Sequence, residues 1–270
     1  MTNDAPRRTE TLLARVRAGG PALVALSGGV DSGLVASVAH EALAGRVLAV
    51  TLTGPANSRH EIDRARQVAR AIGVEHRLVE IDPLARAEYR ANPSDRCFFC
   101  RTVESEALLS AGALWGAQQY LDGVHLDDLG DHRPGLVAMD RAGFRHPLAE
   151  AGWHKVDVRA EARHRDLPNW DAPSEACLAS RIRHGQPISA ELLARVEAAE
   201  ELVRAQGFRQ VRVRVEGTEA RIEVDPKEVP RLVGAPLSVA LARAIMGLGF
   251  DRVTVDPLGY GRRIPTVGAP

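Results

Sequence analysis

The sequence has few cysteines, no long hydrophobic run and no excess of charge of either sign. Its 270 residues include three cysteines, Cys97, Cys100 and Cys177. An odd set in a reducing compartment favours chemistry or metal binding over disulfides. No apolar run approaches the roughly 18 residues of a membrane span, and residues 1–10 lack the pattern of a signal peptide. These absences predict a soluble cytoplasmic protein.

The charges balance, because Lys and Arg together number 35 and so do Asp and Glu. A formal net charge of zero argues against a large nucleic-acid surface, since binding to a phosphate backbone relies on clustered positive charge. It is compatible with a small phosphorylated substrate. Nearly all of the basic residues are arginine, which suits bidentate contacts with anions, although a GC-rich genome produces the same bias.

The most informative stretch is an apolar run that leads into a glycine turn. Residues 22–26 predict a buried strand, residues 27–32 read Ser-Gly-Gly-Val-Asp-Ser, and a helical pattern follows. A strand, turn and helix start of this kind form an anion cradle, because free N–H groups and the positive end of the helix dipole face a phosphate. The alternative is an ordinary strand–helix turn, and the Walker pattern is absent. We expect nucleotide phosphates to bind at Ser27, Gly28, Gly29, Asp31 and Ser32.

Strands and helices alternate at short spacing through the first half of the chain, as in an α/β fold with a doubly wound parallel sheet. The predicted strands are 22–26, 47–52, 76–81 and 119–123. The predicted helices of this half are 10–17, 32–43, 59–72, 102–111 and 155–165. Ligands of such sheets bind at the carboxyl ends of the strands, where the glycine turn lies.

A change of composition near residues 186 and 187 indicates a second domain. Beyond this point the pattern predicts a small α+β unit with helices at 189–206 and 237–248. We expect one domain at 1–186, a second at 187–260 and a tail at 261–270.

Cys97 and Cys100 form a C-x-x-C pair, a spacing shared by zinc sites, redox dithiols, iron–sulfur clusters and buried structural pairs. A tetrahedral zinc would need a histidine in addition to all three cysteines. Three thiolates without a fourth suit a cubane cluster that keeps one iron open.

Cys177 lies in a segment dense in reactive residue types. Arg181, Arg183 and His184 follow it closely and would stabilise a thiolate, which is the nucleophilic form. A small buried cysteine in a loop is the alternative.

Charged residues on predicted strands offer two further binding groups. Arg212 and Arg214 alternate on one strand and therefore share a face, where they could clamp a phosphate, lie in solvent, or pair with Glu223 across the hairpin. Asp122 and Gly123 end another strand. Three acidic residues follow them and could bind magnesium, position a nucleotide or form an exposed acidic loop: Asp127, Asp128 and Asp131.

Taken in order, these blocks resemble the LarE family, ATP-dependent sulfur transferases of the PP-loop ATP pyrophosphatase superfamily. The resemblance runs from about residue 10 to about residue 260 and rests on five blocks. They are 27–32, 122–123, 131–136 (Asp-His-Arg-Pro-Gly-Leu), 177–181 (Cys-Leu-Ala-Ser-Arg) and 211–214 (Val-Arg-Val-Arg).

The resemblance implies a reaction in nickel-pincer nucleotide biosynthesis. A carboxylate of pyridinium-3,5-biscarboxylic acid mononucleotide attacks the α-phosphate of ATP, giving an acyl-adenylate and pyrophosphate. A sulfur nucleophile then displaces AMP. The family has two forms, one in which the cysteine matching Cys177 gives up its own sulfur, and one in which three cysteines hold a [4Fe-4S] cluster that delivers sulfide. The C-x-x-C pair favours the cluster form.

The resemblance also implies roles for particular residues, with ATP, Mg²⁺ and a [4Fe-4S] cluster as cofactors. Cys177 is the catalytic cysteine and, with Cys97 and Cys100, a cluster ligand. Asp122 and Gly123 line the nucleotide site. The resemblance implies that the substrate phosphate is bound by Ser180, Arg181, Arg212 and Arg214. Glu200 and Glu223 match acidic positions that meet a metal between subunits. A sulfide donor and a homo-oligomer, a hexamer in the family, are expected partners.

Two other functions remain open. A PP-loop tRNA thiolase also combines this loop with a C-x-x-C pair, but it should carry a basic face, which the zero net charge argues against. A non-enzymatic nucleotide-binding module would not need the three cysteines.

Overall fold

The chain folds into two compact units, Met1–Glu175 and Ala176–Pro270. The structure, a computed structural model, describes residues 5–130, 134–234 and 237–261. This division differs from the expected boundary after residue 186, because the segment before that point pairs with the second unit. Arg183 donates its backbone N–H to the Val215 carbonyl at 3.0 Å, and Ile182 forms a β-bridge with Val215. Most of the expected tail lies outside the described residues.

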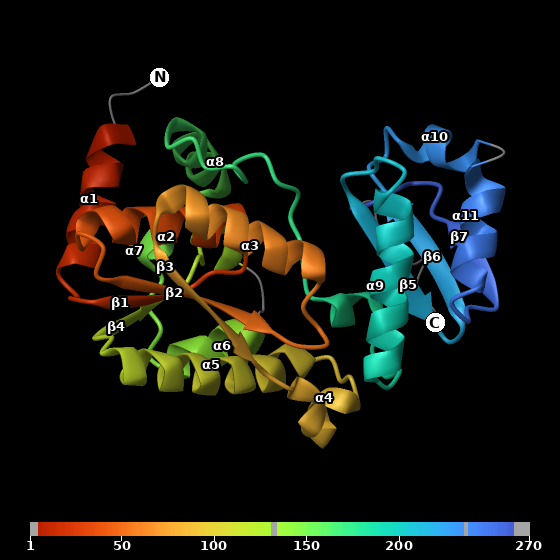
Figure 1. Ribbon diagram of the computed structural model, residues 1–270, viewed down its shortest axis with the longest axis horizontal. Helices are drawn as coiled ribbons and strands as arrows, with labels where there is room; N and C mark the ends of the chain where they lie inside the picture. The colour runs from red at the N-terminus through yellow and green to blue at the C-terminus, as the bar shows by residue number, and fades with distance from the viewer. Residues whose placement is uncertain (1–4, 131–133, 235–236, 262–270) are drawn as a thin grey trace. The chain divides into compact units, whose positions relative to one another are not determined.

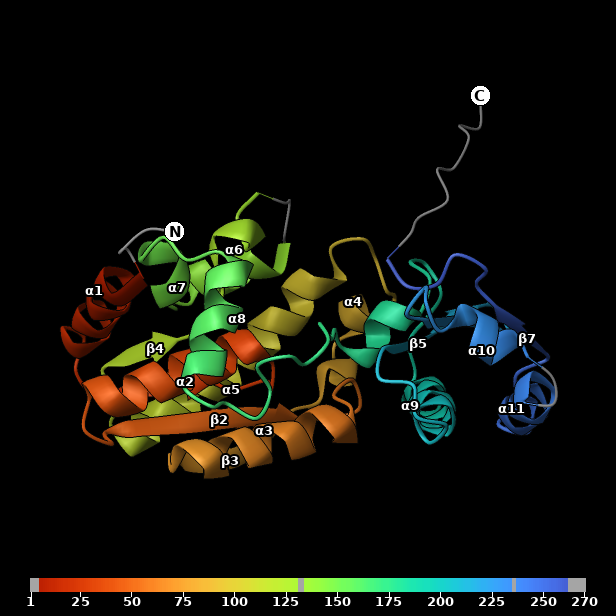
Figure 2. The ribbon, with the colours of Figure 1, turned by 90° about the horizontal axis from the view of Figure 1, so that it is seen from above.

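The first unit is built on a four-stranded parallel sheet in the order β3-β2-β1-β4. Its strands are β1 (Ala22–Ala25), β2 (Val47–Thr53), β3 (Glu75–Glu80) and β4 (Gln119–Leu121). Helices α1 (Ala5–Arg17), α2 (Val30–Ala42), α3 (Arg59–Ile72) and α8 (Lys155–His164) lie on one side of the sheet, and α5 (Arg96–Trp115) and α6 (Pro134–Arg141) lie on the other (Figures 1 and 2). The predicted α/β fold is confirmed.

The central strand β1 is buried on both faces, which explains its unbroken apolar sequence. Ala22 and Val24 belong to the core beneath α2 and α3, whereas Leu23 belongs to a second core with Leu108 of α5 and Met139 of α6. Each face of the sheet therefore has its own hydrophobic layer. The rigid sheet fixes where the loops after β1 and β4 begin.

Helix α3 has the limits that its sequence predicts. Ser58 and Glu61 form a capping box at its start, and Gly73 ends it in the left-handed conformation with φ of 78°. Helix α5 differs from its prediction, because it begins at Arg96 rather than near residue 102. The side chain of buried Arg96 donates a hydrogen bond to Asn92 at 2.6 Å. This contact stabilises a helix start at residue 96, before the predicted one. The C-x-x-C pair thus lies on a helix.

Short helical segments occupy stretches that carry no long periodic pattern. They are η1 (Pro83–Ala85), α4 (Ala87–Arg90), η2 (Leu126–Asp128), α7 (Pro147–Glu150), η3 (Leu178–Arg181) and α10 (Val229–Val233). No helix of the described residues is long and apolar enough to cross a membrane.

The second unit holds a three-stranded sheet in the order β5-β6-β7. Strands β5 (Val211–Glu216) and β6 (Glu219–Val224) form an antiparallel hairpin, and β7 (Arg252–Val255) runs parallel to β6. Helix α9 (Ala190–Arg204) packs against β5, and α11 (Leu237–Met246) packs against β7. Ser189 caps α9, as its sequence predicts.

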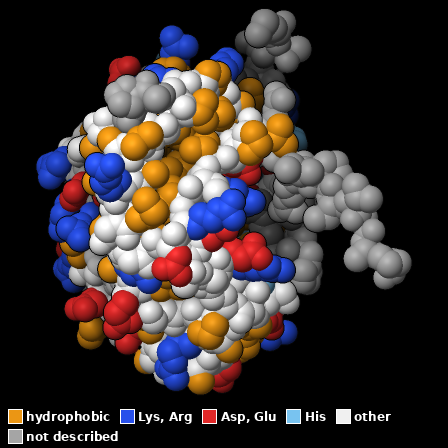
Figure 3. Space-filling model, turned by 90° about the vertical axis from the view of Figure 1, so that its right-hand side faces the viewer, with side chains coloured by type: hydrophobic (Ala, Val, Ile, Leu, Met, Phe, Trp, Pro, Cys, Tyr) orange, Lys and Arg blue, Asp and Glu red, His pale blue; other side chains and the backbone are white. Residues whose placement is uncertain are grey.

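A hydrophobic groove lies on the second unit beside α11. It has a volume of about 270 Å³ and is lined by Ile222, Leu232, Val239, Leu241, Val253 and Val255, among others. Figure 3 shows hydrophobic side chains gathered on the side of the molecule that carries α11 and β7. The groove is thus a feature of the sheet and its covering helices within this unit.

Candidate active site

The glycine turn lies at the topological switch point of the sheet, where the order in which strands are added changes direction. Strands β2 and β3 add to one side of β1, and β4 adds to the other. Ligands of open α/β sheets bind at this switch point, next to the carboxyl ends of the strands. The loop after β4 reaches the loop after β1 so closely that a Cβ on Gly123 would lie 2.6 Å from the Ser32 nitrogen. Residues 27–32 and 122–123 therefore form one site.

Hydrogen bonds made by Ser27 and Ser32 fix the conformation of the glycine turn. The Ser27 N–H donates to Ser32 Oγ at 3.2 Å, and the Ser32 hydroxyl reaches the Gly29 carbonyl at the same distance. Gly28 has φ of +82°, and a Cβ there would lie 2.7 Å from the Glu61 carbonyl. Only glycine satisfies both the backbone angle and the contact with α3.

The first turn of α2 faces this loop. Gly29 is its N-cap, and no side chain caps the helix. The first N–H groups of a helix have no intrahelical partner, and the dipole gives this end a partial positive charge. The arrangement suits an anion, as the sequence predicts.

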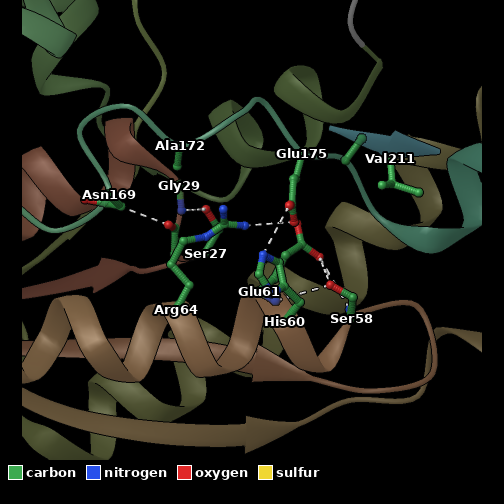
Figure 4. Close-up of polar contacts among 12 residues, drawn as sticks. Ser27, Gly29, Ser58, His60, Glu61, Arg64, Asn169, Ala172, Glu175 and Val211 are labelled. Carbon is green, nitrogen blue, oxygen red and sulfur yellow. Dashed lines mark hydrogen bonds and ion pairs between the residues drawn. The ribbon is translucent and has the colours of Figure 1, made fainter. Parts of the chain in front are cut away.

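Residues 165–175 fix the loop from the side of α3. Asn169 is 2% exposed, and its side-chain N–H donates to the Gly28 carbonyl at 3.0 Å. Arg64 of α3 points toward Glu175, with which it forms an ion pair at 2.8 Å (Figure 4). These contacts connect α3, the glycine turn and the end of the first unit.

Asp31 forms an ion pair with Lys155, the single lysine of the first unit. Lys155 Nζ lies 2.5 Å from Asp31 Oδ2. The other oxygen, Oδ1, is buried, accepts no hydrogen bond among the described residues, and lies 3.7 Å from His125 Nε2. One oxygen of Asp31 thus pairs with an ammonium, and the other faces a histidine without accepting a hydrogen bond.

The acidic loop after β4 holds the start of α8. Asp127 accepts the Lys155 backbone N–H at 2.7 Å and contacts His154 Nδ1 at 2.6 Å. These contacts lower the pKa of Asp127, and the hydrogen bond from the Lys155 N–H has the largest effect. Asp127 therefore anchors a helix in this structure, and Asp131 lies outside the described residues.

Asp122 is buried and binds His146. The two side chains meet at 2.7 Å, and the other ring nitrogen of His146 lies 2.7 Å from Asp140. Burial alone would lower the pKa of His146, but the hydrogen bond and charge of Asp122, joined by those of Asp140, raise this pKa to about 9. The imidazolium and Asp122 form an ion pair beside the glycine turn.

Cys97 and Cys100 lie one turn apart near the start of α5. Cys97 is exposed and Cys100 buried, and neither is in a disulfide. The Cys100 thiol donates to Glu104 at 3.2 Å. A Cβ on Gly135 of α6 would lie 3.5 Å from Cys97 Cβ, so the block at 131–136 reaches the C-x-x-C pair through its described half.

Cys177 begins the segment of the second unit that leads into η3. Arg181 is buried, and its guanidinium donates to the carbonyls of Ala176 and Cys177. The same guanidinium binds Glu200 in a bidentate pair at 2.7 and 3.1 Å. Arg183 pairs with Glu216. Arg181 therefore holds the backbone around Cys177.

Glu200 is completely buried. It accepts hydrogen bonds from Arg181, from Arg204 at 3.0 Å and from the Val213 N–H at 3.0 Å. Burial alone would raise its pKa, but Arg181, Arg204 and the Val213 N–H together lower it. This position differs from the exposed one that a metal ion between subunits needs, and the metal-ligand role stays a prediction.

Arg212 and Arg214 occupy one face of β5, but their surroundings differ. Arg212 is 2% exposed and lies over the Tyr260 ring at 5.2 Å. Arg214 is partly exposed, pairs with Glu223 at 3.1 Å and donates to the Ser180 carbonyl at 2.9 Å. The pairing of Glu223 across the hairpin is confirmed.

Metal ligands do not gather anywhere in the described ranges, where no three His, Cys, Asp or Glu side chains form a group that could hold an ion. Cys97 and Cys100 belong to the first unit, and Cys177 belongs to the second. Sequence reasoning missed Lys155, His146, Arg64 and Asn169. The signal that could have found Lys155 is the scarcity of lysine in this chain.

Comparison with known proteins covers nearly the whole chain. Residues 9–93 match the asparagine synthase family. Over 252 residues the chain is 33% identical to a LarE protein, the pyridinium-3,5-bisthiocarboxylic acid mononucleotide synthase of Lactiplantibacillus plantarum, with 93% of this chain and 90% of that protein aligned. The chain belongs to the LarE family.

Two further relatives carry no activity in their names. An uncharacterized protein of Synechocystis sp. is 40% identical over 239 residues, covering 88% of this chain and 89% of its own length. An uncharacterized protein of Methanocaldococcus jannaschii is 27% identical over 234 residues, covering 87% and 88%. As a LarE family member the chain is an enzyme, an ATP-using sulfurtransferase, and the recognition from its motifs is confirmed.

Proposed function

We propose that this LarE protein converts the carboxylates of pyridinium-3,5-biscarboxylic acid mononucleotide to thiocarboxylates at the expense of ATP. The observation that carries the proposal is its 33% identity, over 93% of its length, to a synthase named for the bisthiocarboxylic product. The glycine turn at the switch point supports the ATP site, and Cys177 supports the sulfur step.

In the first step, negative charge develops on the ATP phosphates, where the glycine turn can stabilise it. A substrate carboxylate oxygen forms a bond to the α-phosphorus of ATP, and the bond to the bridging oxygen breaks, releasing pyrophosphate. The N-terminus of α2 and the Ser27 and Ser32 hydroxyls hold the phosphates. The product is an acyl-adenylate, which is activated toward a sulfur nucleophile.

Magnesium accompanies ATP in this proposal. Asp31 Oδ1 is a buried carboxylate oxygen without a hydrogen-bond partner among the described residues, and Mg²⁺ in such sites takes one or two carboxylates, with phosphates and water completing its shell. Asp31 fits this requirement. Asp127 fits it less well because its two oxygens bind His154 and the Lys155 N–H.

The second step needs a sulfur nucleophile, and we propose that the three cysteines hold an iron–sulfur cluster. The donor set fits a cluster with an open iron, because the chain has three thiols, none of them in a disulfide. When bound, such a cluster supplies sulfide. Cys97 and Cys100 lie near the N-terminus of α5, whose dipole favours thiolates. The chain's Arg181 holds the backbone of Cys177 in place.

The substrate phosphate is assigned to the Arg face of β5. Arg214 keeps a partly exposed guanidinium, one-third exposed, whereas Arg181 is enclosed in its pair with Glu200. We propose Arg214 as the direct phosphate contact and Arg181 as a positioning residue. Ser180, whose carbonyl binds Arg214, lies at the same place.

One assay tests the proposal. Anaerobically purified protein, with reconstituted iron and sulfide, is mixed with MgATP and the pyridinium biscarboxylate mononucleotide. We expect AMP and pyrophosphate in amounts that depend on the substrate, and a nucleotide product heavier by one sulfur-for-oxygen exchange per carboxylate. ATP cleavage that depends on tRNA instead, or none at all, would refute the assignment.

The sulfur source is read from the protein recovered after turnover. The cluster form leaves Cys177 at its original mass, and the protein contains iron and sulfide. Loss of the elements of hydrogen sulfide from Cys177, in a protein free of iron, would instead identify Cys177 as the donor.

A further inference from the structure

Tyr260 is the one partly exposed aromatic side chain of the second unit. The unit has three aromatic residues, Phe208, Phe250 and Tyr260, and all of them are described. Phe208 and Phe250 are each 2% exposed, whereas Tyr260 is partly exposed. Each of the three rings lies under an arginine guanidinium, so this contact alone does not distinguish Tyr260. Its exposure does, because a ligand can stack only on a ring that it can reach.

The backbone of Tyr260 is fixed to the end of β6. The Tyr260 N–H donates to the Val224 carbonyl at 2.8 Å. In the turn before it, Asp256 accepts the N–H groups of Leu258 at 2.9 Å and Gly259 at 3.2 Å. Gly259 has φ of +70°, and a Cβ there would lie 2.7 Å from the same Val224 oxygen. Only glycine allows this approach, so the turn holds Tyr260 in one place.

That place is beside the arginines of β5. Val224 pairs with Val211, the residue before Arg212, and the Arg212 guanidinium lies 5.2 Å from the centre of the Tyr260 ring. Arg214, the proposed phosphate contact, follows two residues later on the same face. Two residues of a strand extend about 7 Å, and one ribose separates the phosphate and the ring of a mononucleotide by a comparable length. A mononucleotide bound to Arg214 through its phosphate can therefore place its ring at Tyr260.

We propose that the Tyr260 ring stacks on the pyridinium ring of the substrate and selects a cationic ring over a neutral one. The inference rests on the proposed function, because it concerns the substrate of that reaction. A pyridinium ring is positively charged, and the face of a tyrosine ring is the negative part of its quadrupole. The guanidinium of Arg212 is an example of a planar cation already in contact with this ring. Stacking forms and breaks no covalent bond.

A neutral aromatic ring suits this substrate better than a carboxylate would. The substrate combines a cationic ring with an anionic phosphate and two carboxylates. An acidic side chain beside it would attract the ring and repel the anionic groups, whereas tyrosine attracts the cation through its quadrupole and carries no charge. The nearby carboxylate, Glu223, is paired with Arg214 at 3.1 Å. Tyr260 therefore adds affinity for the ring without opposing the phosphate.

The test compares three probes that share a phosphorylated ribose. Wild-type protein and Tyr260→Leu are titrated by calorimetry with nicotinamide mononucleotide, whose ring is cationic, with its reduced form, whose ring is neutral, and with ribose 5-phosphate. We expect Tyr260→Leu to bind the oxidised nucleotide about 3- to 30-fold more weakly, from loss of a cation–π contact, and to bind ribose 5-phosphate as the wild type does. Equal losses for these two probes, or no loss for either, would overturn the proposal. A wild type that binds the oxidised nucleotide no more tightly than the reduced one would also overturn it.

Three variants control for structural effects. Tyr260→Phe keeps the ring and should bind all three probes as the wild type does, because the contact requires no hydroxyl. Leu258→Ala shortens an exposed apolar side chain in the same turn and should leave the preference for the oxidised nucleotide unchanged. Fluorinated phenylalanines at position 260 keep the shape of the ring and weaken its negative face. Affinity for the oxidised nucleotide should fall with each added fluorine, and this series decides the question if Tyr260→Leu does not fold.

The kinetic readout distinguishes failure of this inference from failure of the proposed function. Tyr260→Leu should raise the KM for the pyridinium substrate by the same about 3- to 30-fold and leave the KM for MgATP unchanged. If the wild type forms AMP and Tyr260→Leu has the wild-type KM, the role of Tyr260 is wrong and the function stands. If the wild type never forms AMP but the probes bind as expected, the function fails and the stacking role stands.

Discussion

Single glycine residues set the shape of the phosphate site. A side chain at Gly123 would collide with the backbone of Ser32, and a side chain at Gly28 would collide with the backbone of Glu61. Neither has an apolar contact to lose. Their contribution is the space they leave, which lets the loops after β1 and β4 approach each other.

We expect Gly123→Ala to destabilise the first unit and to weaken ATP binding. The added Cβ would lie 2.6 Å from the Ser32 nitrogen, and overpacking of this kind costs about 1–3 kcal/mol. Urea unfolding and MgATP titration measure the two effects. Gly130→Ala is the matched control, since a Cβ there meets nothing within 4 Å. Equal behaviour of the two variants would show that the loops are not in contact.

The His146 ion pair predicts a pH dependence of stability. The folded-state pKa of His146 is raised from 6.5 to about 9, so its contribution is complete below pH 6.5 and is lost as the pH rises to about 9. The melting temperature of the wild type should exceed that of His146→Gln below pH 6.5, and the gap should close above pH 9. A gap that is constant over this range would exclude the ion pair.

The sequence predicted the glycine turn correctly because its residues are contiguous and each has a local conformational reason. Lys155, His146 and Asn169 could not be found in this way, because they reach the site from distant segments through tertiary contacts. Asp127 carries the same lesson. Its carboxylate was a candidate magnesium ligand, and only the fold shows that it holds the start of a helix.

Helix α9 and segment η3 are joined by one buried network. Glu200 on α9 binds Arg181 on η3 and Arg204 one turn further along α9. Removing the carboxylate would leave Arg181 buried without its partner, which is more costly than losing a surface pair. The element that carries Cys177 is thus attached to α9 through charge.

We expect Glu200→Gln to lower the free energy of unfolding of the second unit by about 3–5 kcal/mol, the cost of breaking a buried ion pair. Glu201→Gln, which removes an exposed carboxylate from the same turn, should change it by less than about 0.5 kcal/mol. Denaturant unfolding of both variants makes the comparison. If Glu200→Gln keeps its stability but loses activity, the metal-ligand role gains support instead.

Helix limits followed from capping signals where these were local, and failed where a tertiary contact decided. Ser58 and Gly73 gave α3 its ends. The start of α5 was missed because the buried contact of Arg96 with Asn92 extends the helix toward the cysteines. No apolar period marks that first turn.

The whole molecule divides the proposed chemistry between its two units. The proposed ATP site lies in the first, and Cys177 and the Arg face of β5 lie in the second. The α/β fold was predictable because alternating strands and helices restrict the topology. The limits of the units were not, because pairing between residues 182–183 and 215 is a long-range contact.

This division predicts that the two half-reactions can be separated. Cys177→Ala should keep substrate-dependent exchange of labelled pyrophosphate into ATP, because the first unit is unchanged, and should form no thiocarboxylate. Isotope exchange and mass spectrometry of the nucleotide measure the two steps. Ser32→Ala should impair both. Loss of exchange in Cys177→Ala would show that the cysteine acts before the sulfur step.

The contact between Lys155 and Asp31 joins residues 124 positions apart, and that between Asn169 and Gly28 joins residues 141 apart. Contacts of such high sequence separation form late, because a long loop must close before they stabilise anything. A nascent chain that has released only β1 to β3 already contains the glycine turn, yet it lacks the lysine and the asparagine that complete the cradle. These two contacts can therefore form only after the chain has been made as far as residue 169, so the surroundings of the glycine turn are completed after β4 and α8 have been synthesised.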